Sequence, residues 1–163
     1  MKKYAIVLLL LTAPSIVNAQ TQKQATVKIT GEVTTPLTIT PENIKTYEQT
    51  TVIRKDRDGK DHSYTGVLLS TLLQKAGVTM GKDLKGENLV KYVLASASDG
   101  YQVTFALAEL DKEFTDRSII LSTQIDGQPL AVADGPFRII VQDEKKPARC
   151  MKQVTELHIA FAK

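Results

Sequence analysis

The clearest chemical signal in the sequence is a basic cluster near its carboxyl-terminal end. Four positively charged side chains fall within eight residues: Lys145, Lys146, Arg149 and Lys152. A guanidinium can bind a phosphate or carboxylate through two hydrogen bonds, and an ammonium adds a point charge, so Arg149 and Lys152 could together hold an anion. The alternative is a solvated loop neutralised by the neighbouring Asp143 and Glu144, and on charge alone this is the commoner arrangement.

Other side chains that could do chemistry are few and far apart. His62 and His158 lie on different predicted strands with no second histidine or cysteine beside either, so we expect no metal held by protein side chains. The single cysteine, Cys150, excludes an intramolecular disulfide and leaves open an intermolecular partner or a small buried side chain. The sequence contains no glycine-flanked nucleophilic serine and no glycine-rich phosphate loop. We therefore predict no catalytic residue.

The first nineteen residues have the pattern of a secretory signal peptide. Lys2 and Lys3 precede an apolar run over 5–11, and Val17-Asn18-Ala19 resembles a cleavage site. The apolar run is shorter than the roughly 20 residues that span a bilayer. We predict cleavage after residue 19, a periplasmic or secreted protein, and no stable membrane span afterwards.

The mature chain, residues 20–163, is predicted to be one domain with little net charge. Without Lys2 and Lys3 the basic count falls from 21 to 19 against 18 acidic residues, which leaves a net charge of +1. A charge this small gives no electrostatic reason to expect nucleic acid as a partner. The 42% apolar and 24% charged residues are typical of a soluble globular domain.

Short strands separated by turns must position these residues. Apolar alternation and turn residues predict strands over 26–33, 50–54, 62–65, 91–97, 101–105, 118–125, 137–141 and 156–161. Leucines at helical spacing followed by Gly77 predict the main helix over 67–76, and shorter helices are predicted over 41–47 and 107–110, with a surface loop over 79–88. The predicted fold class is therefore α+β, mainly β, with hairpins and one main helix.

Several short sequence segments occur in a particular order along the mature chain. They read ITGEV at 29–33, YTGVLL at 64–69 with AGV at 76–78, ASDGY at 97–101, DGQPL at 126–130 and DGPFRIIV at 134–141. In this order and spacing they resemble the molybdopterin-binding domain of the sulfite oxidase family over about residues 26–161. Each segment alone is weak evidence for the family, because most of the segments are turns and strands.

The resemblance implies a fold and a set of cofactor-binding residues. In the family, the strand matching 138–141 leads to an Arg-x-x-Lys stretch that holds the phosphate end of the pterin. The resemblance therefore makes Arg138, Arg149 and Lys152 candidates for cofactor binding. Asp99 and Tyr101 are further candidates, with a hairpin turn followed by a core aromatic residue as the alternative.

One departure from the family bears on activity. Members that carry out molybdenum chemistry have a metal-binding cysteine on the strand before the leucine helix, whereas residues 50–59 here read TTVIRKDRDG. Threonine, valine and arginine cannot replace a soft thiolate donor. Molybdopterin thus remains a candidate cofactor without a sulfur ligand from this strand.

Three functions remain open at this stage. The first, which we favour, is a non-catalytic binding module for a pterin-like or other anionic small molecule, or for a periplasmic protein partner. The second is a small molybdopterin-dependent oxidoreductase with a non-cysteine metal donor and an external electron partner, because the sequence given contains neither the haem domain nor the dimerisation domain of sulfite oxidases. The third is a scaffold for protein interaction with a solvated basic loop.

Overall fold

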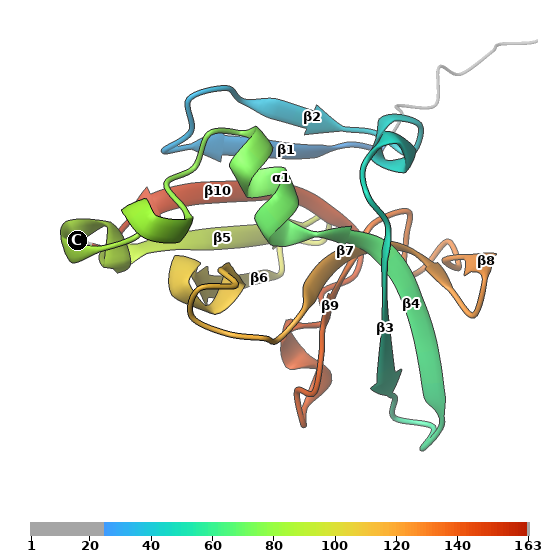
Figure 1. Cartoon of the computed structure of the whole chain (residues 1–163). Helices are drawn as coiled ribbons and strands as arrows, with labels where there is room; N and C mark the ends of the chain where they lie inside the picture. Colours follow the sequence, from blue (N-terminus) through green and yellow to red (C-terminus); the bar gives the residue numbers. More distant parts are fainter. Residues whose placement is uncertain (1–24, 163) are drawn as a thin grey trace, which may run out of the picture.

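The computed structural model describes residues 25–162, which form two five-stranded sheets (Figure 1). The predicted signal peptide, 1–19, lies outside the described residues. The first sheet has the order β2-β1-β10-β5-β6, with β1 (Val27–Gly31), β2 (Leu37–Ile39), β5 (Lys91–Ala97), β6 (Gln102–Ala106) and β10 (Val154–Phe161). The second has the order β3-β4-β7-β8, with β9 also pairing with β7; its strands are β3 (Thr50–Lys55), β4 (Asp61–Leu68), β7 (Ile119–Ile125), β8 (Gln128–Pro129) and β9 (Arg138–Val141).

The first sheet joins the two ends of the described chain. β10 lies between β1 and β5, parallel to β1 with Ile29 opposite Leu157, and antiparallel to β5. Ile29, Leu157 and Ile159 are fully buried, as the apolar alternation of both segments predicts. The alternation could not reveal the parallel pairing, because pairing depends on residues more than a hundred positions apart.

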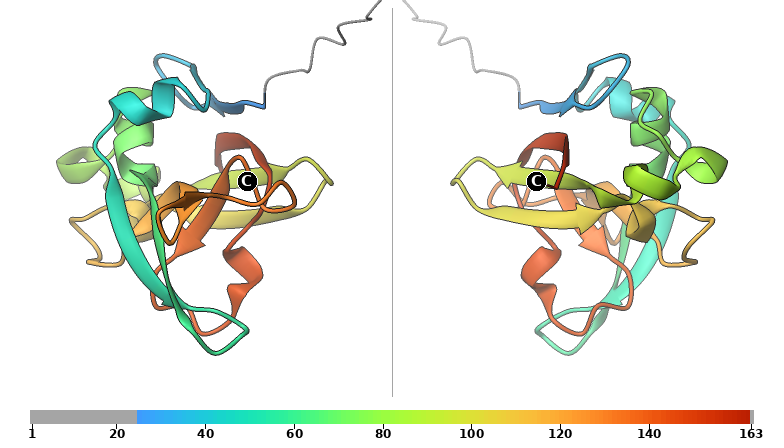
Figure 2. Two further views of the ribbon diagram at one scale, coloured as in Figure 1. Left: turned by 90° about the vertical axis from the view of Figure 1, so that its right-hand side faces the viewer. Right: turned by 90° about the vertical axis from the view of Figure 1, so that its left-hand side faces the viewer.

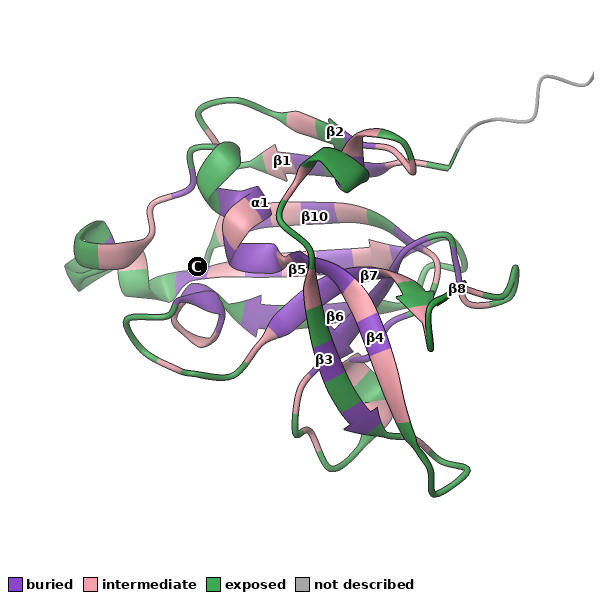
Figure 3. Ribbon diagram, turned by 45° about the vertical axis from the view of Figure 1, so that its right-hand side comes forward, coloured by how far each residue is buried: buried purple, intermediate pink, exposed green. Residues whose placement is uncertain are grey.

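The second sheet contains a long hairpin that forms one wall of the site described below. β3 and β4 pair from Thr50 opposite Gly66 to Lys55 opposite Asp61, and Gly59 in the turn has a φ of 80°. Figure 3 shows β3 alternating between buried and exposed residues, which is the period expected of a strand with one wet face. Both views in Figure 2 show this hairpin and the segment around η5 (Pro147–Arg149) extending on the same side of the body.

The helix α1 (Leu69–Lys75) begins two residues later than the sequence predicts. Val67 and Leu68 continue β4 because they pair with Leu121 and Ile120 of β7, and this pairing overrides their helical spacing. The leucine stripe of the helix is buried, and the helix ends before Gly77, which has a φ of 74°. Among residues 25–162 no helix is long and apolar enough to cross a membrane.

The shorter predicted elements are single turns. The helix expected over 41–47 is wrong in extent, because only a 3₁₀ turn, η1 (Asn43–Thr46), forms. The Thr40 hydroxyl accepts a hydrogen bond at 3.1 Å from the amide of Asn43, the first residue of this turn. The predicted helix over 107–110 is the 3₁₀ turn η4 (Leu107–Leu110), and the loop over 79–88 includes η2 (Gly81–Asp83) and leads into η3 (Gly86–Val90). The mainly β fold with one α-helix among the described residues is confirmed.

Candidate functional site

A cavity of about 360 Å³ opens where the β3–β4 turn meets the start of β9 and the segment after η5. This volume lies within the range of small-molecule sites in proteins. Most of the side chains that line it are charged or titratable: Asp56, Arg57, Asp58, His62, Asp134, Arg138, Pro147, Cys150 and Lys152. The cavity is therefore suited to a polar or charged ligand.

Arg138 forms the buried part of the cavity wall. Its Nη1 donates hydrogen bonds to the Tyr64 hydroxyl and to Asp134 Oδ2, each at 3.1 Å, and its guanidinium carbon lies 5.2 Å from the centre of the Tyr64 ring. The residue is only 7% exposed, yet its Nε has no hydrogen-bond partner among the described residues. A buried donor without a partner is costly, so the fold leaves the hydrogen-bonding capacity of this N–H unused.

A single carboxylate forms ion pairs with two cations at this wall. Asp134 accepts from Arg138 through one oxygen, and its other oxygen lies 2.6 Å from the Lys152 ammonium. Lys152 is half-exposed, with 54% of its side chain accessible. Because one negative charge faces two positive ones, the wall has an excess of positive charge.

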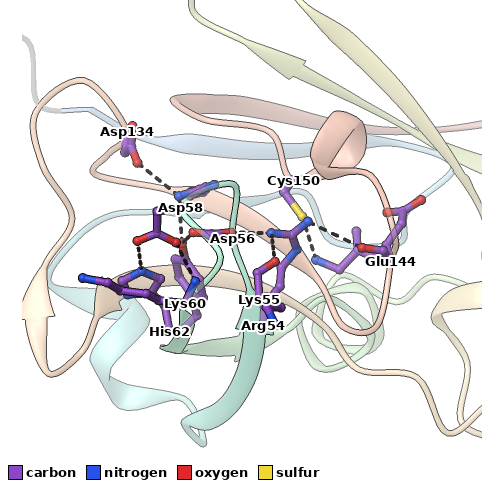
Figure 4. Close-up of polar contacts among 12 residues, drawn as sticks. Arg54, Lys55, Asp56, Asp58, Lys60, His62, Asp134, Glu144 and Cys150 are labelled. Carbon is purple, nitrogen blue, oxygen red and sulfur yellow. Dashed lines mark hydrogen bonds and ion pairs between the residues drawn. The ribbon is translucent and has the colours of Figure 1, made fainter.

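Two further ion pairs lie beside this wall. Arg54, on β3, is buried and pairs with Asp56, whose other carboxylate oxygen accepts a hydrogen bond from the Tyr64 hydroxyl. Figure 4 shows the Asp56 carboxylate directed toward the Arg54 guanidinium and the Asp58 carboxylate directed toward His62. Burial is the main cause that raises the pKa of Tyr64, followed by its hydrogen bond to Asp56, so this phenol stays neutral.

His62 is held between two carboxylates. Its Nδ1 lies 2.6 Å from Asp126 Oδ2 and its Nε2 lies 3.0 Å from Asp58 Oδ2. The hydrogen bond to Asp126, and then that to Asp58, raise the pKa of His62 to about 9, while the pKa values of both aspartates are lowered chiefly by their hydrogen bonds to His62. The imidazole is therefore a cation at neutral pH.

The charges around the cavity sum to a positive excess. Of the residues that line it, four are cationic, Arg57, His62, Arg138 and Lys152, and three are carboxylates, Asp56, Asp58 and Asp134. Arg57 is exposed and makes no ion pair within the described part of the chain. The cavity is therefore positive overall and attracts anions.

Arg149 does not line this cavity. Its guanidinium pairs with Glu144 at 2.8 Å and with both oxygens of Glu109 at 3.0 Å, and it lies 4.9 Å from the centre of the Phe105 ring. Burial alone would lower the pKa of Arg149, but the hydrogen bonds to Glu144 and Glu109 outweigh burial and raise it. The guanidinium thus links the basic segment to η4.

Asp99 and Tyr101 line an adjoining pocket of about 260 Å³, which shares Arg57, Pro147, Cys150 and Lys152 with the main cavity. The Tyr101 hydroxyl donates to the Ala148 carbonyl at 2.9 Å, and Asp99 Oδ1 accepts from the Tyr101 amide at 2.9 Å. Tyr101 is 48% exposed, so it is not the core residue that the alternative required. Four of the five predicted residues, all except Arg149, therefore lie around two neighbouring pockets.

Sequence reasoning missed several residues of the cavity. Asp58 and Asp134 each precede a glycine and were interpreted only as turn residues, and His62 stood out only as a rejected metal ligand. Turn chemistry explains the backbone at these positions but not the direction of the side chains. Only the meeting of the hairpin with the start of β9 brings these groups together.

Residues 13–162 match the family described as "Oxidoreductase molybdopterin binding domain". The chain belongs to this family. The match covers most of the sequence and begins within the segment predicted as a signal peptide. No curated protein sequence matches the chain significantly.

Among solved structures, the chain resembles the sulfane dehydrogenase SoxCD from Paracoccus pantotrophus. The TM-score is 0.65 at 21% sequence identity, over 83% of this chain and 38% of that one. At this identity the similarity shows the fold alone. The chain also spans well under half the length of the SoxCD chain that it matches.

Molybdopterin, the group that this family implies, has two ends with different needs. Its phosphate end needs cationic N–H donors, which the cavity offers in Lys152 and Arg57, while Arg138 adds positive charge from the wall. The residues present therefore fit the anionic end of such a ligand.

β3 offers no sulfur donor to the metal end of the cofactor. β3 buries Val52 and Arg54, and a guanidinium has no lone pair to offer a metal ion. Cys150 lies in the segment that follows η5, is 5% exposed, and accepts a hydrogen bond from the Val141 amide at 3.5 Å. Within residues 25–162 no three His, Cys, Asp or Glu side chains converge in a way that could hold a metal ion. The residues do not fit molybdenum bound by a thiolate from β3.

Proposed function

We propose that this protein is an exported, non-catalytic member of the molybdopterin-binding family that holds a pterin-like or other anionic small molecule in the cavity. The observation that carries the proposal is the positive cavity with a buried, unpartnered Arg138 Nε in its wall. Hydrogen bonds from cationic side chains to an anion are about twice as strong as those between neutral groups.

The lack of a cysteine in β3 supports the non-catalytic part of the proposal. Where a thiolate would be needed, the strand instead has the buried Arg54, which forms an ion pair with Asp56. Export is supported by the basic, apolar and small-residue pattern of residues 1–19. The pattern matches a protein that acts outside the cytoplasm.

The bound anion lies between the exposed cations and the buried one. Lys152 and Arg57 are accessible and can move toward a phosphate or carboxylate, while Arg138 is fixed by Tyr64 and Asp134. Asp134 competes with a bound anion for Lys152, because its carboxylate already pairs with the Lys152 ammonium. A ligand with two negative charges therefore binds better than one with a single charge.

Calorimetric titration of the purified protein tests this function. The ligands are molybdopterin, simple pterin phosphates and a panel of anionic metabolites. We expect at least one to bind, and Lys152→Ala to weaken it about tenfold through the loss of one charge-assisted hydrogen bond. Lys146→Ala is the matched control, since Lys146 belongs to the same basic cluster but does not line the cavity. The proposal is wrong if none of these ligands binds, or if the two substitutions weaken binding equally.

A further inference from the structure

The second sheet has a free edge beside a groove. β3 ends the strand order β3-β4-β7-β8, so only β4 pairs with it. A groove of about 880 Å³ runs along six consecutive residues, 51–56, and is bounded on its other side by residues 142–145. The groove and the anion cavity share Asp56 but otherwise have different linings.

The hydrogen-bond register shows which backbone groups of β3 face away from β4. The Asp56 amide donates to the Lys60 carbonyl at 2.9 Å, so this pair is hydrogen-bonded across the hairpin. Bonded and non-bonded pairs alternate in an antiparallel ladder, so Thr51, Ile53 and Lys55 turn their N–H and C=O groups away from β4. The Lys55 carbonyl already accepts from Arg54 Nη1 at 3.2 Å. The peptide groups of Thr51 and Ile53 remain unpaired within the described chain.

Most of this edge lacks the features that usually protect edge strands. β2 and β8, at other edges, have three and two residues, whereas β3 has six. Its first four residues are all β-branched, and Ile53 is 64% exposed. Edges of this kind are normally shortened, bulged or charged, because a long flat edge pairs with any extended chain. Two residues near the end of the strand are of the protective type, the exposed Lys55 and the inward-pointing Arg54.

The charge of the groove indicates the chemistry of its occupant. Arg54 with Asp56, and Glu144 with Arg149, are already ion-paired. Four charged side chains of the lining make no ion pair in residues 25–162, and they balance: Lys55, Lys145, Asp61 and Asp143. Unlike the anion cavity, the groove has no surplus charge and selects through backbone hydrogen bonds.

We propose that the β3 edge binds an uncharged, extended peptide segment of a partner protein, which adds a strand outside β3. The peptide pairs with the N–H and C=O groups of Thr51 and Ile53, and an apolar or β-branched residue of the peptide packs on Ile53. Main-chain pairing of this kind supplies affinity, and alternate side chains supply specificity. The surface is independent of any ligand in the anion cavity.

The test begins with random peptides displayed on phage and selected against the purified protein. We expect the enriched peptides to be rich in β-branched residues and free of proline. Ile53→Pro removes the outward N–H of Ile53 while leaving the bonds to β4, and should weaken a selected synthetic peptide about tenfold or more. Thr104→Pro is the matched control, because Thr104 holds the same outward position on edge strand β6. It should leave the affinity unchanged.

Amide hydrogen exchange of the unmodified protein provides a readout that does not depend on a variant folding. The amides of Thr51 and Ile53 should exchange quickly alone and slowly with the peptide, while that of Val52 changes little because it already bonds to β4. The proposal fails if no peptide is enriched, if binding survives Ile53→Pro, or if protection appears elsewhere. It also fails if the protein alone forms a dimer that Ile53→Pro dissociates, since the occupant would then be a second copy.

Discussion

The Tyr64 hydroxyl accepts a hydrogen bond from Arg138 Nη1 at 3.1 Å, and the Arg138 guanidinium also lies 5.2 Å from the centre of the Tyr64 ring. Tyr64 belongs to β4 and Arg138 to β9, and both strands pair with β7, which lies between them. The contact fixes two walls of the cavity relative to each other. It therefore couples the stability of the second sheet to the position of the buried cation.

Replacing Tyr64 by phenylalanine tests this coupling. The substitution keeps the ring but removes the hydroxyl that donates to Asp56 and accepts from Arg138. Two buried groups each lose a partner, so we expect a loss of about 1–3 kcal/mol in the free energy of unfolding. Urea denaturation measures it, with the exposed Tyr101→Phe as a control that should cost less. Equal losses would show that the buried hydroxyl has no special role.

The pH dependence of stability tests the state of His62. The folded-state pKa is raised from 6.5 to about 9, so the contribution of its two hydrogen bonds is complete below pH 6.5 and is lost as the pH rises through about 9. We expect the unfolding free energy to fall over this window, and His62→Gln to flatten that fall. Denaturation series between pH 6 and pH 10 give the slope. An unchanged slope in the variant would assign the dependence to other groups.

Gly66 tests the packing between β4 and β7. A Cβ atom at this position would lie 2.1 Å from the Leu121 carbonyl oxygen, where the pairing with β7 shifts register. Gly66→Ala must therefore separate two central strands, and we expect it to cost about 3 kcal/mol. Gly59→Ala, in an open turn with φ of 80°, should cost only about 1 kcal/mol. Thermal or chemical unfolding ranks the two, and the reverse order would contradict the strand packing described here.

Arg149 and Lys152 belong to the same basic cluster but should respond differently to substitution. Arg149 is already paired with Glu109 and Glu144, so Arg149→Ala should lower stability by about 1–2 kcal/mol without weakening anion binding. Paired unfolding and titration experiments separate the two effects. Loss of anion affinity in Arg149→Ala at unchanged stability would show that this guanidinium leaves its carboxylates to bind the ligand.

The sequence predicted those parts of the fold that depend on neighbouring residues. The helical spacing of the leucines and the strand patterns over 50–54 and 62–65 depend on residues close in sequence, and a helix and a hairpin form at these places. The three-residue strand β2 was not foreseen, because its pairing with β1 and not its own pattern defines it. The start of α1 was misplaced for a similar reason, since Val67 pairs with β7.

The candidate site was less predictable than the fold. Arg149 and Lys152 carry the same charge. Arg149 pairs with Glu109 and Lys152 pairs with Asp134, and only Lys152 lines the cavity. His62 is cationic because Asp126 comes from a turn 64 residues away. Charge patterns identify candidate donors, whereas the partners that neutralise or free them are set by the tertiary fold.

The central claim is that this family member binds an anion without a molybdenum centre anchored by a protein sulfur. Elemental analysis of protein purified under mild conditions from its native host tests this claim most directly. We predict molybdenum far below one atom per chain, together with a cavity that still binds an anionic ligand in titration. Molybdenum at one atom per chain that is retained through gel filtration, in material that turns over an oxyanion, would contradict it.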